Sequence, residues 1–197
     1  MSTTTPRKVG VVYDWENTIR TSTDVRPYGH DHRCRQTDPL ALAHILVERA
    51  GAGLGVRAEL AQVFIAAGIH SPFQNRRQWQ ARHYEARRWN SHKLIHAETR
   101  ELVYGEGTCR ESAAIDQLVA DKTLELSRSS ELDLLIVFTN DRGIARATHD
   151  AFRFGRCKIN AATWSDKPSV LFRKGLYVHH LTEQDYLRSS TPSPIAA

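Results

Sequence analysis

The sequence predicts an α/β domain with a central, mainly parallel sheet flanked by helices. Three observations lead to this prediction. Residues 9–13 form a Val-rich apolar run that stops at Asp14, which is typical of a buried central strand. A second apolar run at 132–138 stops in the same way before Thr139. After the first run, a helical segment and another strand-like segment follow in order, which predicts a right-handed parallel unit.

The remaining elements follow from periodicity and from helix-start signals. Asp38 before Pro39 marks a helix start, because an acceptor side chain followed by proline suits the first helical turn. We expect helices at 39–50, 75–93, 110–127 and 142–154, strands at 61–67, 157–162 and 177–181, a strand or hairpin at 94–104, and one helical turn at 170–174.

Length and composition indicate one domain without a membrane segment. The chain has 197 residues, of which 41% are hydrophobic, which is enough for a substantial core. No apolar run could cross a bilayer, and residues 1–8 lack the hydrophobic segment of a secretory signal. Three cysteines without close pairing argue against a disulfide scaffold or a structural zinc site. We expect a cytoplasmic protein with a flexible leader (1–7), a single domain (8–187) and a disordered tail (188–197), with no membrane partner and with a homodimer left open.

The basic charge of the chain favours a polyanionic partner. The formal net charge is +5, and RNA is the candidate partner. Segment 75–93 combines Trp79 with Arg82, Arg87 and Arg88. Arginines bind phosphate and aromatic rings stack on bases, so this segment is a candidate surface for single-stranded RNA. The alternative is an amphipathic helix whose tryptophans are buried and whose arginines face water.

A long segment at 18–36 lacks periodicity and is expected to form a loop beside the end of the first strand. Loops of this length in compact domains are often functional, so its arginines are candidates to contact phosphate. A solvated surface loop explains them equally well. The arginines are Arg20, Arg26, Arg33 and Arg35.

Acidic and amide side chains follow both central strands. Ligands of open parallel sheets bind outside the carboxyl ends of the strands, so these side chains are placed where a site is expected. Carboxylates from separate elements that converge there predict a site for a divalent cation. The alternative for the first group is that it caps a following turn or helix. The candidates are Asp14, Glu16 and Asn17 after the first strand, Asp141 after the second, and Asp116 and Asp121 on the helix at 110–127.

Four motifs in this order resemble the NYN domain, a branch of the PIN-like nuclease superfamily. The resemblance extends over roughly 8–186. The motifs are YDWEN at 13–17, RESAAID at 110–116, FTND at 138–141 and FGRCKI at 154–159. It implies a three-layer, PIN-like (Rossmann-like) domain and metal-dependent endoribonuclease activity on RNA, with Mg²⁺ or Mn²⁺ as the cofactor.

The resemblance also implies roles for particular residues. Asp14, Asp116 and Asp141 would hold the metal, and Asn17 would orient substrate or water, so these four are the expected catalytic residues. Thr139 would donate a hydrogen bond to phosphate. Glu16 and Asp121 are accessory candidates. The residues expected to bind substrate are Thr139, Arg82, Arg87, Arg88, Trp79 and Arg20.

Two departures from the family pattern favour an alternative function. The family commonly has a second Asp two residues after the one that matches Asp141, and Gly143 occupies that position here. Asp116 and Asp121 are five residues apart, about 140° around a helix, so they point away from each other. The alternative is therefore a catalytically weak or inactive RNA-binding or adaptor protein on the same fold.

Overall fold

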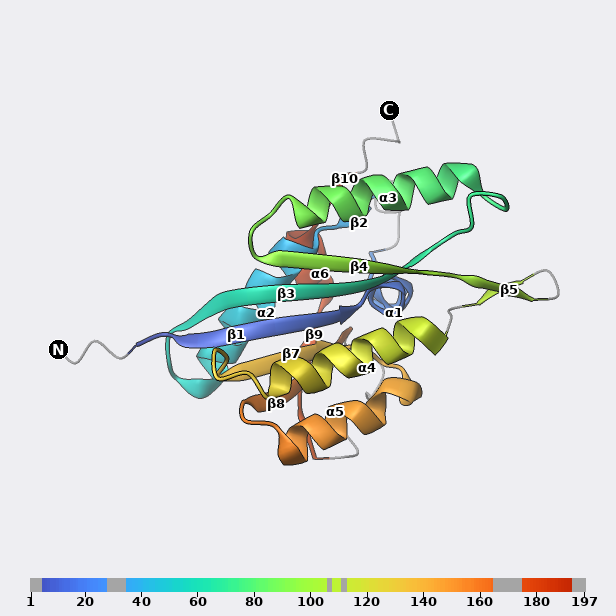
Figure 1. Cartoon of the computed structure of the whole chain (residues 1–197). Helices are drawn as coiled ribbons and strands as arrows, with labels where there is room; N and C mark the ends of the chain where they lie inside the picture. The colour runs from blue at the N-terminus through green and yellow to red at the C-terminus, as the bar shows by residue number, and fades with distance from the viewer. Residues whose placement is uncertain (1–4, 28–34, 106–107, 111–112, 165–174, 193–197) are drawn as a thin grey trace.

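The computed structural model describes residues 5–27, 35–105, 108–110, 113–164 and 175–192. Its centre is a six-stranded sheet in which all neighbouring strands are parallel (Figure 1). The predicted α/β class with a parallel sheet is therefore confirmed. In spatial order the strands are β4 (Ile95–Glu101), β3 (Ala58–Ile69), β1 (Arg7–Asp14), β7 (Leu134–Phe138), β8 (Lys158–Trp164) and β9 (Tyr177–Leu181).

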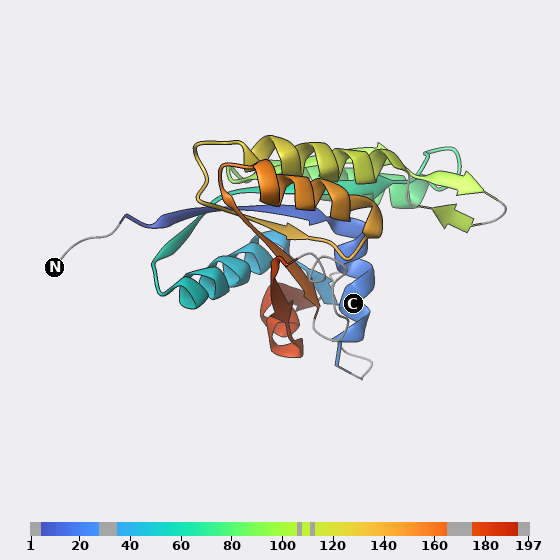
Figure 2. The same cartoon turned by 90° about the horizontal axis from the view of Figure 1, so that it is seen from below.

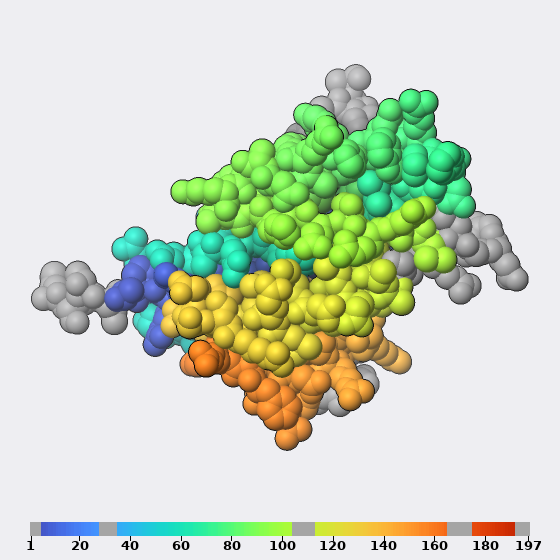
Figure 3. Space-filling view, viewed as in Figure 1, coloured from blue at the N-terminus to red at the C-terminus, as the bar shows by residue number. Residues whose placement is uncertain are grey.

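Helices cover both faces of this sheet and produce three layers (Figure 2). One face packs against α1, α2 and α6, and the other against α4 and α5, the face seen in Figure 3. A small antiparallel hairpin, β5 with β6, extends beyond the sheet after β4 (Figure 1). The bounds are α1 (Trp15–Thr21), α2 (Pro39–Leu54), α3 (Arg76–Asn90), β5 (Val103–Gly105), β6 (Thr108–Arg110), α4 (Ala113–Ser127), α5 (Arg142–Phe154) and α6 (Glu183–Ser189).

The two central strands are buried on both faces. In β1, Val11 and Tyr13 pack on the α2 side, whereas Val12 packs on the α4 side. In β7, Ile136 and Val137 divide between the same two sides. Strands that lose both faces to the core read as continuous apolar runs rather than as alternating ones. For this reason both strands could be predicted from the sequence.

The chain changes direction across the sheet between β1 and β7. From β1 it moves outward to β3 and β4, and it then returns past β1 to β7, β8 and β9 (Figure 1). In open α/β sheets, ligands bind at such a switch point, outside the carboxyl ends of the strands. The ends of β1 and β7 are therefore the expected position of a site.

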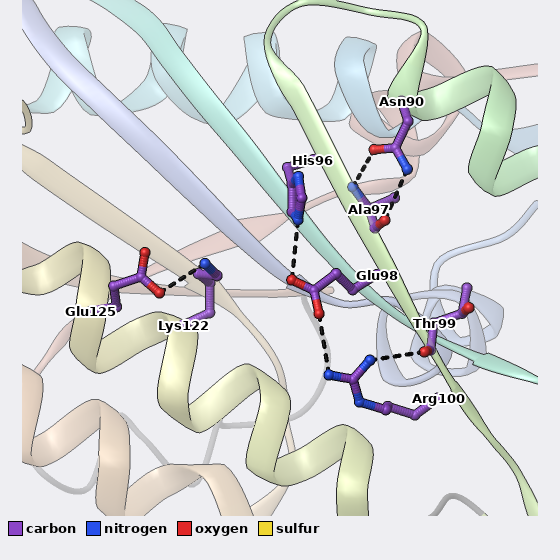
Figure 4. Close-up of polar contacts among 8 residues, drawn as sticks. All are labelled: Asn90, His96, Ala97, Glu98, Thr99, Arg100, Lys122 and Glu125. Atoms are coloured by element: carbon purple, nitrogen blue, oxygen red, sulfur yellow. Dashed lines mark hydrogen bonds and ion pairs between the residues drawn. The ribbon is translucent and has the colours of Figure 1, made fainter.

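Helix α3 lies along the edge strand β4 and is anchored at its last residue. The Asn90 side chain donates to the backbone oxygen of Ala97 (2.9 Å) and accepts from its nitrogen (2.6 Å) (Figure 4). Trp89, which is 3% exposed, joins the core on the α2 side. This anchoring fixes α3 while leaving most of its surface in solvent.

The predicted loop at 18–36 is wrong at both ends. Helix α1 begins directly after β1, because the carboxylate of Asp14 accepts from the backbone nitrogen of Asn17 (3.3 Å) and caps it. A short 3-10 helix (Ser22–Asp24) follows, and β2 (Arg35–Thr37) ends the segment. Residues 28–34 lie outside the described part of the chain.

The predicted boundaries of leader and tail also need correction. Arg7 already belongs to β1, and Arg188 belongs to α6. Strand β10 (Ser190–Pro192) then pairs antiparallel with β2, a partner far away in sequence that local composition does not reveal. The leader at 1–4, the predicted turn at 170–174 and the tail at 193–197 fall outside the described residues. Among the described helices, none combines the length and the apolar character needed to cross a bilayer.

Candidate functional site

The ends of β1 and β7 are joined by hydrogen bonds through Thr139. Its hydroxyl donates to Asp14 Oδ2 (2.9 Å) and accepts from the backbone nitrogen of Asp141 (3.0 Å). Asp14 and Thr139 are both fully buried. Thr139 was predicted to donate to phosphate, but in this structure its proton is directed at Asp14. The hydroxyl therefore fixes the relative position of two candidate catalytic residues.

Asn17 also connects the two strand ends. Its Oδ1 accepts from the backbone nitrogen of Asn140 (2.9 Å), and the side chain is 2% exposed. This contact places Asn17 in the scaffold of the site, whereas the sequence predicted that it orients substrate. Asp141 resembles Asp14 in a second role, because its Oδ1 accepts from the nitrogen of Gly143 (2.6 Å) and caps α5. Asp14 and Asp141 therefore cap helices, as the alternative interpretation expected for the first of them, and both also lie where the sequence predicted a site.

Asp116, in the first turn of α4, lies next to Asp141. A Cβ atom built on Gly143 would be 3.1 Å from Asp141 Oδ1 and 3.3 Å from Asp116 Oδ2, so both carboxylates line the space above this glycine. Burial, and then the neighbouring charge of Asp141, raise the pKa of Asp116. Asp116 Oδ1 is buried and has no hydrogen-bond partner among the described residues. At this position the structure therefore combines two neighbouring carboxylates with a buried oxygen that no described residue satisfies.

The oxygen atoms of Asp116, Asn140 and Asp141, here called the rim, suit a hard divalent cation. Asn140 Oδ1, from the same strand end, is a second buried oxygen without a partner in the described chain. Within the described residues, no group of three or more His, Cys, Asp or Glu side chains is placed to hold a metal, so the predicted trio of carboxylates is not gathered as ligands. Mg²⁺ in proteins, however, commonly uses one or two carboxylates and completes its shell with water and substrate phosphate. Asp116 and Asp141 fit that pattern, whereas Asp14 contacts the site through Thr139.

The two accessory candidates, Glu16 and Asp121, differ in their position relative to the site. Asp121 is exposed and accepts from Gln117 (2.6 Å), one and a half turns beyond Asp116, so the structure does not bring it to the site. Glu16 lies beside the site and pairs with Arg82 (2.7 Å), which also pairs with Glu85 (2.9 Å). The guanidinium of Arg82 is therefore already neutralised by two carboxylates, which weakens its predicted role in phosphate binding.

The other α3 residues predicted to contact RNA are accessible on the outer surface of the helix. Arg87 and Arg88 are exposed, and no ion pair to either occurs within the described residues. Trp79 stacks on His83, with ring centroids 5.0 Å apart, and Tyr84 is 70% exposed. The burial predicted by the alternative interpretation applies to Trp89 alone. The described α3 surface therefore combines free guanidinium groups with accessible rings.

The basic residues on β4 and on the neighbouring part of α4 are paired within the protein. On the face of β4 toward α4, Glu98 pairs with His96 (3.1 Å) and Arg100 (3.2 Å), and Lys122 pairs with Glu125 (2.8 Å) (Figure 4). These cations on β4 and α4 are therefore paired, whereas Arg87 and Arg88 on α3 have no ion pair among the described residues.

The arginines predicted to lie on the loop at 18–36 also differ in their contacts. Arg26 donates to Ser22 Oγ (2.9 Å), and Arg35 donates to Ser190 Oγ (2.9 Å). Both therefore support the local fold. Arg20 is exposed on α1, and Arg33 is outside the described residues. Of the described candidates in this segment, Arg20 alone is exposed on a helix and makes no side-chain hydrogen bond or ion pair within the described residues.

Sequence reasoning missed two features of this region. Asn140 was quoted only as part of a motif, although an amide oxygen is a ligand that hard cations accept. Glu85 was not singled out, although its spacing of three residues from Arg82 on a helix is a signal for an ion pair. The partnership of Arg82 with Glu16 could not be predicted from spacing, because 66 positions separate them.

Comparison with known proteins supports the fold. No family model matches the chain, and no curated protein matches its sequence. The structure is similar to a crystal structure described as a protein of unknown function from Vibrio parahaemolyticus, with a TM-score of 0.61 and 11% sequence identity. The alignment covers 94% of this chain and 99% of that one. At this level of identity the similarity establishes the fold class alone, and the resemblance to NYN domains stays a prediction.

Proposed function

We propose that this protein is a cytoplasmic, metal-dependent endoribonuclease that hydrolyses phosphodiester bonds of RNA with Mg²⁺ or Mn²⁺. The observation that carries the proposal is the Asp116 and Asp141 pair at the switch point, with Gly143 leaving space beside both carboxylates. Like charges held together in a partly buried place cost stability unless a cation or a proton offsets them. Such arrangements are a frequent property of functional sites.

The residues of the site divide into two groups in this proposal. Asp116 and Asp141 hold the cation, and Asn140 supplies an amide oxygen from the same strand end. A bound divalent cation lowers the pKa of water and offsets negative charge at the scissile phosphate. Asp14 and Asn17 are positioning residues: Asp14 holds Thr139, and Asn17 holds the backbone of Asn140. Their contacts keep the two strand ends at a fixed separation.

A cleavage assay tests the proposal directly. Mixed single-stranded and structured RNAs are incubated with Mg²⁺ or Mn²⁺, with EDTA as the control. We expect cleavage by the wild type that stops in EDTA and in both Asp116→Asn and Asp141→Asn. Glu131→Gln is the matched control, because it removes one carboxylate that is 78% exposed at the opposite end of the sheet. Cleavage that persists in both aspartate variants would remove this pair from the mechanism.

RNA binding is assigned to the outer surface of α3, with Trp79, Arg87 and Arg88 as contacts and Arg20 as a further one near the site. The double substitution Arg87→Ala with Arg88→Ala should weaken binding and lower the slope of log affinity against log salt by roughly 1.4, at about 0.7 per phosphate contact. The control pair is Arg57→Ala with Arg128→Ala, two exposed arginines away from α3. Equal salt slopes for both pairs would exclude α3 as the phosphate contact.

One observation favours a second candidate function. Gly143 leaves the rim with one carboxylate fewer than the family pattern, and the described residues contain no three-ligand group. An RNA-binding protein without catalysis would therefore bind RNA on α3 and leave it intact with every divalent cation tested. The cleavage and binding assays together separate the two functions.

A further inference from the structure

A pocket of about 220 Å³ lies between α1, the end of β3 and α3. Glu16, which lines it, belongs to the helix that Asp14 caps. On the other side the pocket is bounded by Leu102 and Gly68. A Cβ atom on Gly68 would be 3.3 Å from Ile115, the residue before Asp116, so this wall adjoins α4. The pocket thus adjoins α1, which follows Asp14, and α4, which carries Asp116.

The polar wall of this pocket is held rigidly. Arg82 donates to Glu16 Oε1 (2.7 Å) and to Glu85 Oε2 (2.9 Å), and its guanidinium lies over the Trp89 ring at 5.8 Å. The amide of Gln36 donates to Glu85 Oε1, so both oxygens of Glu85 are in use. Glu16 Oε2, in contrast, has no hydrogen bond from any described residue, and the Glu16 side chain is 27% exposed. A fixed carboxylate therefore presents one open acceptor to the pocket.

The chemistry of this acceptor selects the ligand. An ionised carboxylate accepts hydrogen bonds and cannot donate them, so the group that binds it must bring N–H or O–H donors. Cytosine offers an exocyclic amine that acidic side chains recognise. The corresponding edge of uracil carries a carbonyl in place of that amine, and two acceptors facing each other repel. Cytosine and uracil are otherwise nearly the same in size and shape.

We infer that the pocket between α1 and α3 is a nucleobase subsite that prefers a base with an exocyclic amino group, and that Glu16 is the residue that reads that group. The inference rests on the proposed RNA substrate and adds base preference to it. With the phosphate at Asp116 and Asp141, a neighbouring nucleotide of the same strand reaches the pocket past Glu16. Uracil is the base that this subsite disfavours.

The test compares labelled oligomers of cytidine and uridine by fluorescence anisotropy in EDTA, where binding is measured without cleavage. The wild type should bind the cytidine oligomer about tenfold more tightly, the effect expected of one charge-assisted hydrogen bond. Glu16→Gln should remove the preference, because its amide can donate to uracil as well as accept from cytosine. Ala81→Leu, which narrows the pocket without changing its charge, should also remove it, and Glu131→Gln should retain it.

Each result has a definite meaning. Equal binding of the two oligomers by the wild type, or a preference that survives both Glu16→Gln and Ala81→Leu, overturns the subsite. Mapping the cleaved positions in an RNA of mixed sequence separates the two proposals. Cleavage without base preference retains the nuclease and removes the subsite. A base preference in binding without cleavage under any metal retains the subsite and removes the nuclease.

Discussion

The two ends of strands β1 and β7 place their charges in opposite ways. At the amino end, Asp133 accepts from Arg7 Nη1 (2.7 Å) and from the backbone nitrogen of Lys8 (2.8 Å). At the carboxyl end, Asp141 faces another acid, Asp116. Unlike charges therefore lie together at the amino ends of these two strands, and like charges from α4 and the β7 end lie together at the carboxyl ends.

The pKa values of the two ends shift in opposite directions. The backbone N–H of Lys8, and then the guanidinium of Arg7, lower the pKa of Asp133. Burial, and then Asp141, raise the pKa of Asp116. Ionised Asp133 therefore adds to folding stability, whereas ionised Asp116 reduces it. Such a cost at the switch point of the sheet supports the site proposed there.

After the loss of cleavage expected in the two aspartate variants, the largest expected effect is also at the carboxyl end, at Thr139. Thr139→Val keeps the volume but removes the hydroxyl that joins Asp14 to Asp141, so cleavage should fall about 10- to 100-fold, as for other supports of metal ligands. Thr148→Val is the matched control, because Thr148 is a buried threonine whose hydroxyl donates within α5. Steady-state cleavage of a short RNA measures both. Equal activity of the two variants would show that the hydroxyl bridge is not needed.

Gly143→Ala should have the next largest effect. Its Cβ would enter the space beside Asp116 and Asp141, so affinity for Mn²⁺ should fall about tenfold by titration calorimetry. Gly53→Ala is the control, because its Cβ would be 3.8 Å from the nearest atom outside the local helix. Both changes add helix propensity, up to about 1 kcal/mol, and thermal melts of both variants check that a loss of binding is not a loss of stability. Unchanged affinity in Gly143→Ala would place the cation elsewhere.

Thermal melts at a series of pH values, without metal, measure how Asp133 at the amino ends of β1 and β7 and Asp116 at their carboxyl ends each change the stability. Asp133→Asn should lower stability at neutral pH by roughly 1 kcal/mol, and this loss should disappear as the pH falls through the lowered pKa of Asp133. Asp116→Asn should hold or raise stability at neutral pH by less than about 1 kcal/mol, because it removes a cost that is complete only above the raised pKa of Asp116. Matching pH profiles in the two variants would contradict the electrostatic contrast.

The smallest expected effect is at the outer pair of the amino end. Lys8 Nζ and Glu131 Oε2 are 3.8 Å apart, and their side chains are 47% and 78% exposed. Lys8→Gln should change stability by less than about 0.5 kcal/mol, because exposed pairs at this distance contribute little. Urea denaturation against the wild type measures it. A larger loss would mean that this ion pair also organises the amino end of the sheet.

Much of the fold could be predicted because it depends on neighbours in sequence. The runs at 9–13 and 134–138 contain no charged residue and do not alternate with polar positions, which is the pattern of strands buried on both faces. Asp38 with Pro39 marked the start of α2 through local capping chemistry. The same local logic placed Asp14 and Asp141 at the ends of their strands.

The arrangement of the site depended on tertiary contacts. Register in the sheet brings Asp14 to Thr139 across 125 positions, and helix packing brings Arg82 to Glu16 across 66. The pairing of β2 with β10 likewise orders a stretch whose composition indicated disorder. By itself, the sequence determined which segments become strands and helices and which acids end them, because those properties follow from local periodicity and capping. Only the tertiary structure decided which acids become neighbours and which arginine has its charge offset by carboxylates, because long-range pairing is fixed by packing the whole core.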